Sequence, residues 1–415
     1  MIDIFSRILY NNKQNIVLFI AKKEDEPMQF KVGYYEFSTD VGMNFQLNRF
    51  YSSGILDYEE LMELGKKATD FEKWISLFTE AGEKAEAEGS HLKAALCYRA
   101  AQFYTLSDAT DAKGNSLKKS LYEKCMAHYD AYYGTIKELN YVRIPYEKGY
   151  LPVYFIKPEH SKGIIVLHGG YDSFIQEFLA FLPYFAKQGY ETYFFEGPGQ
   201  GEVLMRCGIQ MTPQWEHCTS AVLDHFGLDD VTLIGISLGG YLAPRAAAYD
   251  QRIQRVVMFD LIYDFYGAIT NKMGKKKARL FDYMTAHPRN ILWKWLDKKL
   301  KENYFTHWLL GQGYAIYENV HTPCDYFNCI KQYNTRELSP MLKQDVLVLA
   351  GASDLYTIYY EDQLKALKNA RSVTGRLFTE EECADHHCQI GNLQLALDTI
   401  ENWIGSKTDG EKSNS

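Results

Sequence analysis

Apolar residues recur at two different spacings along the chain. The change of spacing divides the chain into an N-terminal part and a later part. Over residues 57–133 they recur every three or four positions, as at Trp74 and Phe78, which is typical of amphipathic helices. This pattern predicts a mainly helical N-terminal domain over residues 1–135. The first 45 residues carry no pattern clear enough to assign.

Short, uninterrupted apolar runs replace the helical pattern after Gly134. Such runs are typical of buried strands, and helical patterns separate most of the later ones, which implies crossover connections and a largely parallel sheet. The sequence therefore predicts an α/β core over residues 136–266 and 339–405, with a mostly parallel central sheet flanked by helices. The predicted strands are 141–144, 151–155, 163–167, 190–195, 231–236, 256–259 and 345–350.

A long aromatic and basic stretch interrupts the sheet pattern. Its helical character and its place between two strands predict a helical lid insertion over residues 267–338. Its rings could line a pocket for an aromatic or long acyl substrate, although packing within the lid's own core is favoured. Its basic run from Lys272 to Arg279 could attract an acidic substrate, although a solvated helix face is favoured. The small, polar tail over 406–415 is expected to be disordered.

Composition narrows the classes of function. The 415 residues include 45 Lys and Arg against 53 Asp and Glu, so the net charge of −8 argues against a nucleic-acid partner. No apolar run approaches the length needed to cross a bilayer, and the longest near the start covers residues 16–21. The eight cysteines form no dense disulfide framework. We expect a cytoplasmic protein without a membrane partner.

One short motif carries the clearest chemical signal. Gly235-Ile236-Ser237-Leu238-Gly239 directly follows a predicted strand and precedes a helical pattern. In that setting Gly-x-Ser-x-Gly is typical of a sharp turn that exposes a nucleophilic serine, because the glycines leave room for the turn. We therefore predict that Ser237 is a nucleophile. The alternative is a glycine-rich turn in which Ser237 only caps the helix.

A serine hydroxyl needs a base and an orienting acid to act as a nucleophile near neutral pH. Asp354 follows the predicted strand 345–350 and is the preferred acid, with Asp260, which also follows a strand, as its competitor. The adjacent His386 and His387, about thirty residues further on, are the candidates for the base. Spacing alone does not choose between them.

The third requirement is a set of N–H donors for the negative charge that develops on a carbonyl oxygen. The glycines of His168-Gly169-Gly170-Tyr171 follow a strand and let the backbone approach a substrate. We expect the donors to be the N–H groups of Leu238 and of Gly170 or Tyr171.

No cofactor or metal is expected. Cys324 with Cys329, and Cys383 with Cys388, have histidines nearby that could suggest zinc. Their spacing is a weak match to zinc sites, and a metal would consume the candidate base.

Four segments carry a resemblance to known proteins: His168-Gly169-Gly170-Tyr171, Glu196-Gly197-Pro198-Gly199-Gln200-Gly201, Gly235 to Gly240, and His387-Cys388-Gln389. Together they resemble the α/β-hydrolases, and with the helical leader they resemble the 2,6-dihydroxypseudooxynicotine hydrolase-like branch. That branch includes polyketide-shortening hydrolases and is related to the fermentation-respiration switch protein. In it the catalytic histidine directly precedes Cys-Gln, which implies His387, whereas relatives tend to carry glycine where this chain has Cys383. The resemblance covers roughly residues 45–405.

The resemblance implies the α/β-hydrolase fold and a serine hydrolase acting on a small molecule. Ser237 would attack a carbonyl, His387 would carry the proton to the leaving group, and Asp354 would hold the imidazolium, before water hydrolyses the acyl-enzyme. The bond would be an ester or an activated carbon–carbon bond, as in a β-diketone, in an aromatic or polyketide-like substrate. Homodimerisation is a further expectation from the family.

Two other classes of function stay open. A serine peptidase of the prolyl-oligopeptidase kind shares the order of the triad but usually carries a β-propeller rather than a helical leader. A weakly active regulatory or binding protein on the same fold would keep the residues without meaningful turnover.

Overall fold

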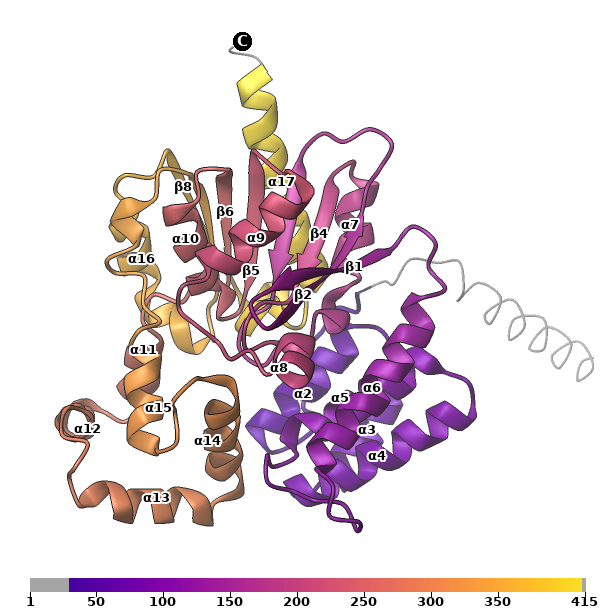
Figure 1. The fold of residues 1–415 in the computed structure, drawn as a ribbon, viewed down its shortest axis with the longest axis vertical. Helices are drawn as coiled ribbons and strands as arrows, with labels where there is room; N and C mark the ends of the chain where they lie inside the picture. Colours follow the sequence, from indigo (N-terminus) through magenta and orange to yellow (C-terminus); the bar gives the residue numbers. More distant parts are fainter. Residues whose placement is uncertain (1–29, 413–415) are drawn as a thin grey trace, which may run out of the picture.

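The computed structural model describes residues 30–412 of the chain. The apolar run at 16–21 and the start of the predicted N-terminal domain lie outside the described residues. Figure 1 shows three parts: an α/β core, a group of N-terminal helices beneath it, and a helical insertion beside that group. None of the described helices is both long and apolar enough to cross a membrane.

An eight-stranded sheet forms the centre of the core, in the order β1-β2-β4-β3-β5-β6-β7-β8. β2 pairs antiparallel with both β1 and β4, and all other neighbours are parallel. This sheet confirms the predicted α/β class with a mostly parallel sheet. Its strands are β1 (Asn140–Tyr146), β2 (Gly149–Ile156), β3 (Ile164–His168), β4 (Glu191–Phe195), β5 (Val231–Ile236), β6 (Ile253–Phe259), β7 (Asp345–Gly351) and β8 (Ser372–Phe378).

The central strands and the edge strand β8 differ in how their side chains are buried. Every residue of β5 and β7 is buried, because helices cover both faces of the sheet, and both strands read as unbroken apolar runs. In β8 buried or half-buried residues alternate with exposed ones over most of the strand. The sequence analysis did not identify β8, since its short alternating pattern includes Gly375 and Arg376.

Helices pack on both faces of the sheet (Figure 1). They are α7 (Phe181–Lys187), α8 (Gly201–Cys207), α9 (Glu216–Phe226), α10 (Gly239–Tyr249), α16 (Tyr360–Ala366) and α17 (Leu393–Lys412), with short 3-10 turns η1 (Ile175–Phe178), η2 (Ser339–Met341), η3 (Leu355–Tyr359), η4 (Glu380–Glu382) and η5 (His387–Gln389).

The C-terminal helix requires a correction to the predicted disordered tail at 406–415. α17 continues through Lys412. Two contacts support the continued helix: Ser406 Oγ donates to the Trp403 carbonyl, and Lys407 Nζ donates to Ser372 Oγ at 2.9 Å. The last three residues lie outside the described part of the chain.

Five helices of the described residues form the N-terminal group. Trp74 and Phe78 of its long helix α4 are fully buried, and the Trp74 indole N–H donates to the Ala100 carbonyl, which ties α4 to α5. The first of the five, α2, begins in the stretch that the sequence pattern left unassigned. The helices are α2 (Val41–Ser52), α3 (Tyr58–Lys67), α4 (Phe71–Ala87), α5 (His91–Tyr104) and α6 (Leu117–Tyr133).

Five further helices lie between β6 and β7, in the predicted lid region. Some of their aromatic residues pack among themselves, as where Phe281 contacts Trp293 and Phe327, and others contact rings outside the insertion, as where Tyr304 stacks on Phe71. The basic run is exposed to solvent. The indole N–H of Trp308 donates to the Phe103 carbonyl, so the insertion also contacts α5. The helices are α11 (Phe265–Asn271), α12 (Lys275–Ala286), α13 (Leu292–Glu302), α14 (Tyr304–Ile316) and α15 (Pro323–Ile330).

Candidate active site

Ser237 lies at the sharp turn between β5 and α10. Its φ of 61° is in the left-handed region, which a residue other than glycine rarely adopts. A Cβ atom on Gly235 would lie 2.1 Å from the Gly239 carbonyl oxygen, so this position has no room for a side chain. The Ser237 N–H donates to the Phe259 carbonyl at 2.5 Å, which anchors the turn to β6. Strand, turn and helix thus have the arrangement that the motif predicts.

A continuous chain of hydrogen bonds joins Ser237, His387 and Asp354. His387 Nε2 lies 2.8 Å from Ser237 Oγ, and His387 Nδ1 lies 2.7 Å from Asp354 Oδ2. The three residues come from the turn after β5, the loop after β7 and the turn η5, which all lie at the carboxyl-terminal edge of the parallel strands. The arrangement places a base next to a hydroxyl and a carboxylate behind that base.

The environment of His387 favours its protonated form. Burial alone would lower the pKa of His387, but the Asp354 carboxylate, together with Cys388, holds the pKa well above the usual range. The charge that would form on the ring when it accepts a proton is therefore stabilised in advance.

His386 faces away from this site. Its ring stacks on Tyr34 with 3.6 Å between the ring centroids. Only His387 reaches Ser237, as the resemblance implies. Cys383, where relatives tend to carry glycine, has a φ of 55°, so the chain adopts the left-handed conformation there without a glycine.

Asp260, the competing acid, occupies a different place. Its Oδ2 lies 3.9 Å from His387 Nδ1, too far for a hydrogen bond, and accepts the Cys388 N–H at 2.9 Å. Its Oδ1 accepts the side-chain amide of Gln389 at 2.7 Å. Asp260 is fully buried, and this burial together with the nearby Asp354 carboxylate raises the pKa of Asp260 to about 8.

The predicted oxyanion-hole residues lie together beside Ser237. A Cβ atom on Gly170 would lie 2.5 Å from the Leu238 nitrogen, so the loop after β3 meets the Ser237 turn at this point. None of the hydrogen bonds among residues 30–412 has the N–H of Leu238 or of Tyr171 as its donor. Backbone N–H groups in buried segments are normally paired, so both remain available to a ligand.

A profile of the alpha/beta hydrolase family matches residues 164–392. This match covers more than half of the chain. The chain belongs to the alpha/beta hydrolase family.

Known hydrolases agree with this assignment. The protein is 28% identical to the hydrolase acrC of Aspergillus aculeatus, over 66% of this chain and 70% of that protein. It is 33% identical to the alpha/beta hydrolase psoB of Aspergillus fumigatus, over 52% of each. The solved 2,6-dihydroxy-pseudo-oxynicotine hydrolase shares the fold, with a TM-score of 0.57 and 20% identity over 88% of this chain and 94% of that one. These findings confirm the resemblance, and they identify the protein as a hydrolase.

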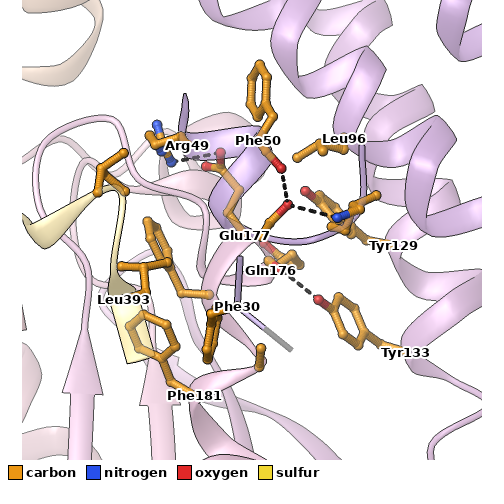
Figure 2. Close-up of a pocket in the computed structure, with 15 residues that line it drawn as sticks. Phe30, Arg49, Phe50, Leu96, Tyr129, Tyr133, Gln176, Glu177, Phe181 and Leu393 are labelled. Atoms are coloured by element: carbon orange, nitrogen blue, oxygen red, sulfur yellow. Dashed lines mark hydrogen bonds and ion pairs between the residues drawn. The ribbon is translucent and has the colours of Figure 1, made fainter. Parts of the chain in front are cut away.

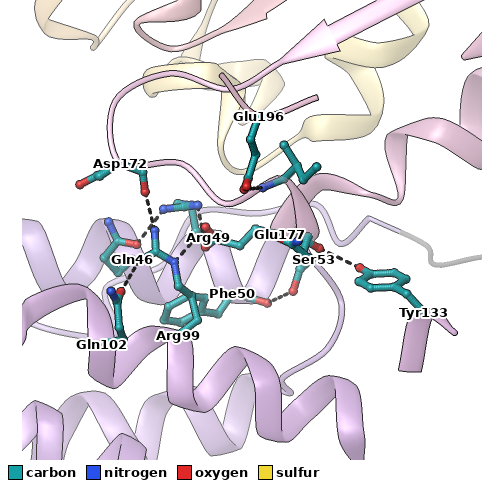
Figure 3. Close-up of polar contacts among 12 residues, drawn as sticks. Gln46, Arg49, Phe50, Ser53, Arg99, Gln102, Tyr133, Asp172, Glu177 and Glu196 are labelled. Carbon is teal, nitrogen blue, oxygen red and sulfur yellow. Dashed lines mark hydrogen bonds and ion pairs between the residues drawn. The ribbon is translucent and has the colours of Figure 1, made fainter. Parts of the chain in front are cut away.

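The N-terminal helices of this hydrolase support the loop after β3. Arg99 of α5 is buried, pairs with Glu177 at 3.0 Å, and donates from Nη2 to the Asp172 carbonyl at 2.8 Å (Figure 3). Glu177 also pairs with Arg49 of α2 at 2.9 Å. Buried ion pairs of this kind hold a fixed geometry, because each charge depends on its partner. Sequence analysis missed Arg99, since its partners lie about eighty residues away in a different part of the fold.

A cavity of the hydrolase lies apart from Ser237, between the N-terminal helices and the core. Its volume is about 30 Å³, and its wall includes Phe50, Tyr133, Phe181 and Leu393 (Figure 2). The pair of Arg49 and Glu177 also lines it. Since none of the candidate catalytic residues belongs to its wall, we do not assign the substrate to it.

Asp260, Asp354 and His387 also meet the distance requirement for a metal site, since one ligand atom of each lies within 4.8 Å of the others. A metal ion there would replace the proton that joins His387 to Asp354. The hydrogen-bond chain therefore accounts for these residues better than an ion does. Neither cysteine pair considered for zinc joins such a group in the described part of the chain.

Proposed function

We propose that this protein is a serine hydrolase in which Ser237, His387 and Asp354 form the catalytic triad. One observation carries the proposal: the hydrogen bonds of 2.7 and 2.8 Å that join Asp354, His387 and Ser237 in that order. The same three groups perform acyl transfer on several unrelated folds, where the geometry rather than the sequence position defines the role.

The proposed reaction has two stages. Ser237 Oγ attacks the carbonyl carbon of the substrate while His387 Nε2 accepts the hydroxyl proton. The charge on the carbonyl oxygen is held by the N–H of Leu238 and that of Gly170 or Tyr171. The leaving group departs with the proton from His387, and water, activated by the same base, hydrolyses the acyl-enzyme.

Aromatic rings beside the triad support an aromatic or polyketide-like substrate. The Tyr356 ring centroid lies 5.6 Å from that of His387, and Phe265 lies 6.1 Å from Tyr356. Tyr171 lies 5.7 Å from Tyr317, whose buried hydroxyl has no hydrogen-bond partner among the described residues. A cluster of rings with a buried, unpaired hydroxyl is the kind of lining that suits a flat, oxygen-bearing ligand.

The bond cleaved is an ester or an activated carbon–carbon bond. An ester releases an alkoxide, which His387 protonates. Cleavage of a carbon–carbon bond releases a carbanion, which requires stabilisation as the ketone enolate that a cleaved β-diketone releases, or as an electron-rich ring, before it too is protonated. Both routes leave the same acyl group on Ser237, so the catalytic residues serve either.

A labelling experiment tests the triad. Wild type should react with a fluorophosphonate probe and turn over p-nitrophenyl acetate or butyrate, and both activities should fall by about 10⁴-fold or more in Ser237→Ala and His387→Ala. His386→Ala is the matched control and should keep both, because its ring stacks on Tyr34 outside the site. A folded wild type that neither reacts nor turns over would favour the regulatory or binding protein.

A substrate panel then separates the remaining alternatives. Aryl esters, aryl β-diketones and proline-containing peptide anilides should be compared by kcat/KM. We expect the esters or diketones to be preferred, since helices rather than a propeller precede the core among the described residues. Preference for the peptide anilides would instead indicate a peptidase.

A further inference from the structure

The segment Glu196-Gly197-Pro198-Gly199-Gln200-Gly201 carries part of the resemblance, yet the proposed triad gives it no task. It connects β4 to α8, and the side chain of Gln200 within it is fully buried. A buried amide is retained at little cost only when its donor and acceptor both have partners. The partners of Gln200 are therefore informative about its role.

Both ends of the Gln200 amide have a backbone partner. Nε2 donates to the Gly170 carbonyl at 2.9 Å, and Oε1 accepts the Gly197 N–H at 3.0 Å. The second bond fixes which end of the amide faces Gly170, since an exchange of the two ends would oppose donor to donor and acceptor to acceptor.

The bond to Gly170 determines the direction of a candidate oxyanion-hole donor. The Gly170 carbonyl and the Tyr171 N–H belong to one planar, trans peptide, so they point in opposite directions. When Gln200 holds the carbonyl on one side, the N–H is turned to the other side. That N–H is not a donor to any group in the described part of the chain.

The rest of the segment forms two further hydrogen bonds to the same loop after β3. The Gly201 N–H donates to the Ser173 carbonyl at 3.1 Å, and Glu196 Oε1 accepts the Ile175 N–H at 3.0 Å. These bonds hold the loop as a whole. Among the described residues, the Gln200 bond is the one that acts on the peptide containing the Tyr171 N–H.

We propose that Gln200 is a positioning residue, whose side-chain amide orients the Gly170–Tyr171 peptide so that the Tyr171 N–H stabilises the oxyanion formed at Ser237. This inference rests on the proposed function. Gln200 itself does not touch the reacting atoms; it acts through the backbone of the loop.

Gln200→Met tests this role, because methionine keeps the length of the side chain and removes both hydrogen bonds. The matched control is Gln344→Met. Gln344 is also buried, donates to the Ala247 carbonyl at 2.8 Å and accepts the Lys343 N–H at 2.8 Å, at a place outside the candidate active site. The two variants therefore lose the same kinds of bond in different places.

The expected result is a split between the two variants. Gln200→Met should lower kcat on a p-nitrophenyl ester, and the maximal rate of fluorophosphonate labelling, by roughly 10- to 100-fold, with KM and the probe's dissociation constant changed less than about threefold. Gln344→Met should leave all four values near those of wild type, while both variants lose similar thermal stability. A purely structural role would lower the active fraction and not produce this split.

Several results would overturn the inference. They are a normal kcat in Gln200→Met, or equal losses of kcat in both variants. If Gln200→Met does not fold, Gln200→Glu keeps the size and the acceptor for Gly197 but opposes an oxygen to the Gly170 carbonyl, and a normal kcat there would have the same meaning. A wild type that is not labelled at Ser237 would overturn the proposed function and this inference together, and is recognised before any variant is made.

Discussion

The loops that follow β6 and β7 carry the same residue type at the same edge of the sheet, but use it differently. After β7, Asp354 presents an oxygen to His387 Nδ1 at 2.7 Å. After β6, Asp260 lies 3.9 Å from the same nitrogen and uses its two oxygens for the Cys388 N–H and the Gln389 amide. One carboxylate contacts the ring of His387, and the other holds the backbone next to it.

This difference shows what position in a sheet can and cannot decide. The carboxyl ends of neighbouring parallel strands bring both aspartates near the histidine, so position alone leaves two candidates. The hydrogen-bond partners separate them, because a carboxylate that is already occupied by two N–H donors is poorly placed to orient a ring. We expect the two aspartates to give different effects when each is replaced.

The largest effect is expected for Asp354→Asn, which should lower kcat by about 10⁴-fold, because an amide at this place favours the wrong tautomer of the histidine. The pH dependence should change as well. In wild type, burial lowers the pKa of His387 but Asp354 raises it further, so activity is lost as pH falls through a raised pKa. In Asp354→Asn, which lacks the carboxylate charge, activity should be lost at a lower pH than in wild type. The check is kcat/KM measured from pH 5 to 10.

Asp260→Asn is the control for that measurement. In this variant kcat/KM should fall at nearly the same acidic pH as in wild type. If Asp260→Asn instead lost activity as severely as Asp354→Asn, with the same shift to lower pH, the acid would have been assigned to the wrong loop.

An intermediate effect is expected from Asp260→Asn on stability. The asparagine can accept only one of the two N–H groups and turns its own NH₂ toward the other. The variant should therefore lose about 1 to 3 kcal/mol in the free energy of unfolding, with a kcat reduced by no more than roughly tenfold. Urea unfolding at pH 7 measures the first value. An unchanged unfolding midpoint would contradict the role of Asp260 in holding the loop of Cys388.

The last prediction concerns how this stability difference changes with pH. Burial raises the pKa of Asp260 to about 8 in the folded protein, above its ordinary value. The folded state therefore binds this proton more tightly than the unfolded state does. The stability that this proton contributes is fully present below about pH 4 and is lost as pH rises through 8. The advantage of wild type over Asp260→Asn should be larger at pH 5 than at pH 9. A difference that grows with pH would contradict the raised pKa.

Much of the fold was predictable because its strongest signals are local. The unbroken apolar runs predict seven of the strands, and periodicity predicts the helices around Trp74 and Phe78. The edge strand β8 and the helix α2 were not predicted, since β8 is a short alternating run and α2 begins within the first 45 residues, where no clear pattern was assigned. The end of α17 was not predicted either, because a polar composition alone does not distinguish a helix from a disordered tail.

The candidate site was predictable to the level of residue types. The motif around Ser237 and the resemblance around His387 point to groups that the structure brings into hydrogen-bond contact. Their catalytic roles stay predictions. The tasks of Gln200 and Arg99 could not be predicted, because each depends on a backbone carbonyl that comes near only after folding.

The contact between Arg99 and the Asp172 carbonyl has a consequence for protein engineering. α5 also receives the Trp308 indole at its C-terminal end, so one helix meets both the loop beside Ser237 and the insertion. The N-terminal helices therefore cannot be exchanged between relatives as an independent module. A chimaera would retain a well-formed loop after β3 only if the grafted helix placed a guanidinium within hydrogen-bond distance of the Asp172 carbonyl.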